Sequence, residues 1–218
     1  RVLFRSAVGF NSGNALNTWF SGALASSDFN RFNGYAGNDT IVGNGHTLLD
    51  YRTSDSGVTV TFTGSGAGTV TGDSSVGTDT FTGVYGVRDS YYDDVIQGSD
   101  ANGNGLNDAE VINLSGGNDW VDGGAGFDVV SYISQGGGAT VDLANHLATG
   151  TTIGTDQLFN IEGVIGSKGD DVLIGDGGDN LFAGIMGNDA IDGAAGTDTV
   201  TYFYDAAGVT VDLEHGTA

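Results

Sequence analysis

The chain has 218 residues, no cysteine and no proline, and its 28 acidic residues outnumber 6 basic ones, which gives a net charge of −22. The missing cysteines exclude a disulfide framework and Cys-ligated zinc, and the charge argues against nucleic acid or an anionic membrane as a partner. No apolar run approaches the ~20 residues that a membrane-spanning helix needs. Hydrophobic residues make up 39% of the chain and recur at regular intervals, which favours a folded repeat protein over disorder.

The N-terminal part of the chain is predicted to be a degenerate repeat block. We expect Arg1–Ser6 to be a translated sequencing adapter, and residues 7–50 to form decayed nine-residue repeats. The clearest of these repeats is Gly34–Val42, which has Asp39 at its sixth position. The aromatic pair Trp19–Phe20 fits no repeat. Its favoured role is to cover the open end of a hydrophobic core, and the alternative is to bind a sugar.

Two longer segments of the chain are copies of one another. Residues 51–88 and 132–165 each begin with a tyrosine and continue with alternating apolar residues, a pattern typical of a half-buried strand. Gly77–Val87 aligns with Gly154–Val164 without a gap, at an offset of 77 residues. A third copy begins in residues 202–218. We therefore predict β inserts that alternate with blocks of short repeats.

Residues 89–131 are predicted to form a second repeat block, with some irregularities. Its first unit has Asp89 in place of the first glycine of the pattern. The sixth positions of its units are occupied by Asp94, Glu110, Asp119 and Asp128. Glu110 and Asp128 are eighteen residues apart and could share one cation. Asp119 is expected on the opposite edge, without a neighbour at that spacing.

The irregular start of this block allows a second interpretation. Asp100, Asn102 and Asn104 alternate and are followed by a glycine, as at the start of an EF-hand loop. The twelfth position is Val111 instead of glutamate, and no helical pattern flanks the loop. A distorted turn of the repeat is therefore favoured over an independent calcium loop.

Residues 166–201 are the most regular part of the chain. They divide into four consecutive units of nine residues: GSKGDDVLI, GDGGDNLFA, GIMGNDAID and GAAGTDTVT. The first and fourth positions are glycines: Gly166, Gly169, Gly175, Gly178, Gly184, Gly187, Gly193 and Gly196. The sixth positions are Asp171, Asn180, Asp189 and Asp198, and the eighth are Leu173, Phe182, Ile191 and Val200.

This spacing has a physical interpretation. Glycines at fixed offsets indicate tight turns, and the final three residues, with one apolar residue in the middle, indicate a short strand. Successive strands stacked in parallel would build one apolar stripe, and burying each such side chain contributes about 1.5–3 kcal/mol. Stacked turns bring the sixth-position carboxylates together. Repelling carboxylates and backbone carbonyls are hard oxygen ligands, which favour Ca²⁺.

These units resemble the RTX, or hemolysin-type, calcium-binding repeat family, whose nonapeptide G-G-x-G-x-D-x-U-x binds Ca²⁺. The resemblance implies an all-β fold, a right-handed parallel β-roll in which turns on the same edge are eighteen residues apart. It implies several Ca²⁺ ions, held by turn carbonyls at the paired glycines and by sixth-position side chains. Asp171 would pair with Asp189, and Asn180 with Asp198. Asn180 keeps an oxygen ligand but loses a charge, so its site should be weaker.

The sequence contains no catalytic motif. It has no HExxH and no G-x-S-x-G, so we predict a module that is not an enzyme. We predict that the module folds on Ca²⁺ binding as part of a larger extracellular, adhesin-like protein whose ligand the sequence does not identify. The resemblance implies export by type I secretion machinery. The alternative is a C-terminal secretion and stability module of a secreted metalloprotease or lipase.

Overall fold

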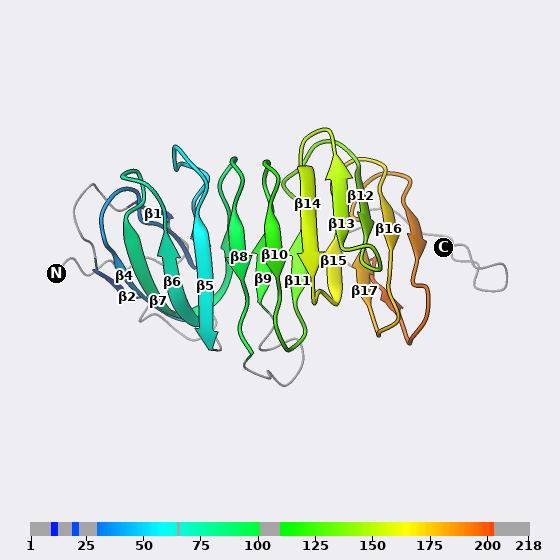
Figure 1. The fold of residues 1–218 in the computed structure, drawn as a ribbon, viewed down its shortest axis with the longest axis horizontal. Coiled ribbons are helices and arrows are strands. Elements are labelled where there is room, and N and C mark those ends of the chain that lie inside the picture. The colour runs from blue at the N-terminus through cyan, green and yellow to red at the C-terminus, as the bar shows by residue number, and fades with distance from the viewer. Residues whose placement is uncertain (1–9, 13–18, 22–29, 65, 101–109, 203–218) are drawn as a thin grey trace.

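The computed structural model describes residues 10–12, 19–21, 30–64, 66–100 and 110–202. Every regular element in these ranges is a β-strand, so the predicted all-β fold is confirmed. The strands lie side by side along the long axis of the molecule, and the colour changes steadily from blue to orange along that axis (Figure 1). Each turn of the chain around the roll, here called a coil, is therefore stacked on the others largely in chain order. No helix in the described ranges is long and apolar enough to cross a membrane.

The strands form two hydrogen-bonded ladders that share β4 and β7. The first ladder runs in the order β2 (Trp19–Ser21), β4 (Thr40–Asp50), β7 (Thr78–Arg88), β6 (Ala67–Thr71), β5 (Thr59–Gly64), β8 (Val95–Gln97), β10 (Trp120–Asp122), β14 (Gly154–Phe159), β13 (Leu147–Gly150), β12 (Ala139–Asp142), β16 (Val172–Ile174) and β18 (Ala190–Asp192). The second runs in the order β1 (Phe10–Ser12), β3 (Asn30–Asn33), β4, β7, β9 (Val111–Asn113), β11 (Val129–Ser131), β15 (Gly163–Ile165), β17 (Leu181–Ala183) and β19 (Thr199–Val200).

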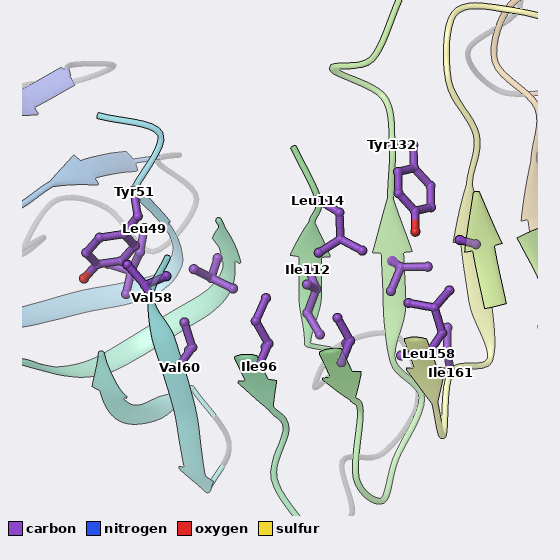
Figure 2. Packing of buried hydrophobic residues seen from close by; sticks show 14 of the residues in the cluster. Leu49, Tyr51, Val58, Val60, Ile96, Ile112, Leu114, Tyr132, Leu158 and Ile161 are labelled. Atoms are coloured by element: carbon purple, nitrogen blue, oxygen red, sulfur yellow. The ribbon is translucent and has the colours of Figure 1, made fainter. Parts of the chain in front are cut away.

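The short strands have the predicted form of one inward apolar residue between two outward ones. Ile96, Ile112 and Val121 are the middle residues of β8, β9 and β10, and all are fully buried. Figure 2 shows Ile96 and Ile112 on facing ribbons, pointing into the space between them. The two ladders therefore enclose one continuous core, which runs from Phe32 to Phe182.

The regular block has the predicted spacing between coils. β16 pairs in parallel with β18 and β17 with β19, each eighteen residues further along the chain. Leu173 and Phe182 are fully buried, whereas Ile191 and Val200 are partly buried and pack against the same core. Coils that are consecutive in sequence thus lie in opposite ladders, and coils two apart stack directly.

The inserts continue the first ladder in a way that the sequence did not predict. In each copy three antiparallel strands form a meander, β5–β6–β7 in the first and β12–β13–β14 in the second. The outer strands then pair in parallel with the neighbouring short strands, as β5 does with β8 and β12 with β16. The mostly parallel roll therefore contains two antiparallel meanders. The boundaries of the predicted blocks and inserts stay a prediction.

Several predicted features lie outside the described residues. These are Arg1–Ser6, the third insert copy in residues 203–218 and the interior of the alternative calcium loop, residues 101–109. The backbone of Trp19–Phe20 belongs to β2, but the predicted capping role of the two side chains remains untested.

Candidate calcium-binding sites

The glycine-rich turns place the sixth-position side chains against the backbone of their own coil. All eight predicted glycines lie in the turns between β15 and β19. Gly187 and Gly196, at fourth positions, have φ values of 117° and 125°, which favour glycine. A side chain at the first-position Gly166 would collide with the Asp171 carboxylate, and one at Gly184 with the Asp189 carboxylate. The first glycine therefore leaves room for the acidic side chain to turn inward.

A second contact connects each acidic side chain to the coil stacked beside it. The backbone N–H of Asp171 donates to Asp189 Oδ1 at 2.9 Å, and the N–H of Asn180 donates to Asp198 Oδ1 at 2.9 Å. The predicted pairs at a spacing of eighteen residues are thus adjacent in the structure. One carboxylate oxygen of each aspartate, Oδ1, therefore holds the neighbouring coil. Calcium ligation by these residues stays a prediction.

The middle block repeats this arrangement on both edges. The N–H of Glu110 donates to Asp128 Oδ1 at 3.1 Å, as its spacing predicts. Asp119 has no partner eighteen residues away, as expected, but it has neighbours at other spacings. The N–H of Asp94 donates to Asp119 Oδ1 at 2.9 Å, and the N–H of Asp119 donates to Asp156 Oδ1 at 3.1 Å. The longer segments after β8 and after β11 change the sequence spacing, whereas the stacking of the strands is kept.

Three acidic residues in the inserts belong to the same ladders and were not predicted. The N–H of Asp39 donates to Asp79 Oδ1 at 2.8 Å, and the N–H of Asp128 donates to Glu162 Oε2 at 2.8 Å. Asp156 is the third. Asp79 and Asp156 each end a Gly-Thr-Asp tripeptide, as Asp198 does in the regular block. That shared tripeptide, with an apolar residue two positions later, was a signal that could have identified both.

Burial distinguishes the predicted residues from ordinary surface acids. Seven of them are buried: Asp39, Asp94, Glu110, Asp119, Asp128, Asp171 and Asn180. Asp189 and Asp198 are half-buried, because no further described coil covers them. Burial raises the pKa of Asp128 to about 7 and that of Asp94 to about 6, and it also raises the pKa of Glu110. Holding these groups ionised in this fold is therefore unfavourable without a nearby positive charge.

Some of the second carboxylate oxygens accept a hydrogen bond from the protein, and others do not. In the inserts, the buried hydroxyl of Tyr51 donates to Asp79 Oδ2 at 2.8 Å, and that of Tyr132 donates to Asp156 Oδ2 at 2.9 Å. In the middle block, Asp119 Oδ2 and Asp128 Oδ2 are buried and have no hydrogen-bond partner. Buried oxygens normally have a partner, and unpaired carboxylate oxygens next to turn carbonyls suit Ca²⁺. These residues therefore fit the predicted metal.

Comparison with known proteins agrees with this chemistry. The family model of the RTX calcium-binding nonapeptide repeat matches residues 24–46, 104–131 and 165–200, in four copies. These ranges include all or part of each of the three predicted blocks. None of the curated proteins that were compared matches the chain. The chain therefore contains RTX calcium-binding nonapeptide repeats.

Proposed function

We propose that this chain is a calcium-dependent structural module of a secreted protein, and that it folds when Ca²⁺ binds outside the cell. The observation that carries the proposal is the pair of buried oxygens, Asp119 Oδ2 and Asp128 Oδ2, that lack a hydrogen-bond partner. A buried, unsatisfied carboxylate is among the least favourable groups in a protein interior. Two such groups on opposite edges of one roll indicate that the folded state needs a cation at both edges.

The chain's own residues prepare these sites. The backbone N–H of Glu110 holds Asp128 Oδ1 and that of Asp94 holds Asp119 Oδ1, which fixes the orientation of each carboxylate. The second oxygen of each carboxylate and the carbonyls of the turn would then hold Ca²⁺, which neutralises repulsion within a chain of net charge −22. Extracellular calcium modules bind with Kd values of about 10⁻⁴–10⁻³ M. At ten times Kd, each site contributes about 1.4 kcal/mol to folding.

This linkage predicts a chain that is unfolded at low calcium and folded at high calcium. Circular dichroism of the purified chain in EGTA and in millimolar Ca²⁺ tests it, and Mg²⁺ at the same concentration serves as a control for ionic strength. We expect the β signal to appear only with Ca²⁺. Asp55, which is exposed, provides a matched control, because Asp55→Asn should leave the calcium midpoint unchanged. An equally strong β signal in EGTA would contradict the proposal.

We further propose that the parent protein is an adhesin-like structural protein exported by type I machinery. Support comes from the two structurally equivalent inserts, because repeated alternation of blocks and inserts suits an extended surface protein. The same repeats also support the alternative, a stability module of a secreted hydrolase. The complete reading frame separates the two. Further repeats would favour the adhesin, and an HExxH or G-x-S-x-G motif would favour the hydrolase.

A further inference from the structure

Asp89 occupies a position of the roll where no other described coil has a carboxylate. It follows β7 directly, and its N–H donates to the carbonyl of Asn113 at 3.2 Å. The equivalent position of the next coils is held by Leu114 and Tyr132, whose N–H groups donate to the following coil in the same way. Figure 2 shows the side chains of Leu114 and Tyr132 extending from neighbouring strands of one ladder. In the regular block the same position is glycine, as at Gly166.

The Asp89 side chain is enclosed and has no hydrogen-bond partner. Its exposed fraction is 0%, and neither Oδ1 nor Oδ2 accepts a hydrogen bond. The Ser115 hydroxyl is also buried and adjoins Asp89 at the limit of hydrogen-bonding contact, without forming a well-shaped hydrogen bond to it. Asp119 Oδ2 is a further buried oxygen without a partner. Three residues from two stacked coils thus have unsatisfied oxygens in one region of the core.

These oxygens are close enough to bind one ion. Asp89, Asp94 and Asp119 each offer a carboxylate oxygen, and the three oxygens lie within 4.8 Å of one another. Ligands on opposite sides of one Ca²⁺, each about 2.4 Å from it, would show a separation of this size. Asp94 is already held by the N–H of Val58 and by the Ser90 hydroxyl. The oxygens that still lack a partner therefore belong to Asp89, Asp119 and Ser115.

Without a cation this region is unfavourable. The fully buried carboxylate of Asp89 lies close to the carboxylates of Asp94 and Asp119. A leucine such as Leu114 would fill the same position with no charge to bury. Two arrangements would relieve the repulsion: a proton shared between Asp89 and Asp119, or a bound cation. A shared proton would join one pair of oxygens, whereas a cation could contact the oxygens of Asp89, Asp119 and Ser115 together.

We infer that Asp89, Asp119 and Ser115 form an interior calcium site next to Asp94, and that Asp89 supplies a ligand absent from the nonapeptide pattern. The inference rests on the proposed function and deepens it, because Asp119 Oδ2 is the oxygen already assigned to the cation on this edge, and Asp89 and Ser115 add ligands to that same ion. Since the ligand residues are almost fully buried, the ion enters while the coils close and leaves only when they open. With Asp89 as an additional charged ligand, this ion should be retained longer than the other bound ions when EGTA removes calcium.

The test is a count of retained calcium. The full chain is folded in Ca²⁺, exposed briefly to EGTA at a temperature where it stays folded, desalted and analysed by atomic spectroscopy. We expect about one ion per chain in the wild type and none in Asp89→Asn. Asp89→Leu copies the residue found at Leu114, and it should fold and also retain none. Asp189→Asn, in the regular block, should lower the total bound before EGTA and leave the retained ion in place.

The possible outcomes separate the two proposals. If the Asp89 variants retain as much calcium as the wild type, the interior site is wrong and the proposed function stands. If the wild type retains none and Asp89→Leu is more stable in EGTA, Asp89 is a buried acid that shares a proton with Asp119, and the site is again wrong. If no protein binds calcium before EGTA, both proposals fail.

A second measurement is needed in case both Asp89 variants fail to fold. Trp120 directly follows Asp119, so Tb³⁺ retained at the interior site should emit when tryptophan is excited. Trp120→Phe should remove that emission without changing the amount of retained Tb³⁺. Emission that persists in Trp120→Phe would place the retained ion elsewhere and overturn the inference.

Discussion

The inserts and the repeat blocks place carboxylates at the same points of the ladders. They differ in the partner of the second carboxylate oxygen. In the inserts, Tyr51 and Tyr132 donate to the second oxygens of Asp79 and Asp156, so each carboxylate is satisfied within the protein. In the middle block, the second oxygens of Asp119 and Asp128 have no such donor. Serine hydroxyls donate to three other block carboxylates, those of Asp94, Glu110 and Asp171. Calcium dependence should therefore concentrate at the unpaired oxygens of the middle block.

The largest expected effect comes from removing calcium and then changing the pH. Burial raises the pKa of Asp128 to about 7 and that of Asp94 to about 6, so the folded state binds more protons than the unfolded state above about pH 4. In calcium-free buffer, the residual folded fraction should therefore be greatest near pH 4 and fall as the pH rises to 8. In millimolar Ca²⁺ this loss should disappear. Circular dichroism measures the folded fraction of a chain that is freed of calcium by EGTA at neutral pH and then dialysed to each pH, and a metal-free chain whose β signal increases towards pH 8 would contradict the prediction.

Tyr132→Phe should have the next largest effect, and it tests the insert side of the comparison. Removing the hydroxyl leaves Asp156 Oδ2 buried without a hydrogen-bond donor, which should lower the free energy of unfolding by about 1–3 kcal/mol. Because no metal is involved, the loss in unfolding free energy should be the same at two different calcium concentrations that both saturate the sites. Urea unfolding at two calcium concentrations measures it. Tyr91→Phe, at an exposed tyrosine, is the matched control and should have little effect. If added calcium restored the stability lost in Tyr132→Phe, the distinction between insert and block would be wrong.

Asp128→Asn tests a carboxylate of the repeat block. Whether the substitution stabilises or destabilises the chain should depend on calcium. With Ca²⁺ at ten times Kd, losing one site should reduce stability by about 1.4 kcal/mol. In EGTA near pH 7, the same substitution removes a buried charge and should stabilise what folded structure remains. Calcium titrations and urea unfolding with and without EGTA measure both signs. The proposal for this site would be wrong if the substitution destabilised the chain equally in both conditions.

The regular block could be predicted from the sequence because each local feature repeats. Glycine at Gly166 and Gly184, an acid five residues later and an apolar residue after that fix the turn, the strand and the register together. The inserts were harder, since alternation predicts a strand but does not tell whether its neighbour is parallel. Asp89 also gave no signal as a ligand. In the sequence it is only a missing glycine, and its contact with Asp119 depends on a coil that folds back from thirty residues further along.

The smallest effect is expected at Asn180, where a block residue departs from the acidic pattern. Asn180 Oδ1 accepts the N–H of Asp176 at 3.0 Å, and the N–H of Asn180 donates to Asp198. Asn180→Asp keeps this geometry and adds a charge to the site. Hydrogen bonds and ligand contacts of charged groups exceed those of neutral ones by about 1 kcal/mol, which corresponds to a calcium midpoint lowered about fivefold at this site. Calorimetric titration measures the change. An unchanged midpoint would show that this edge does not bind calcium through its sixth position, because the added charge would then have no cation to attract.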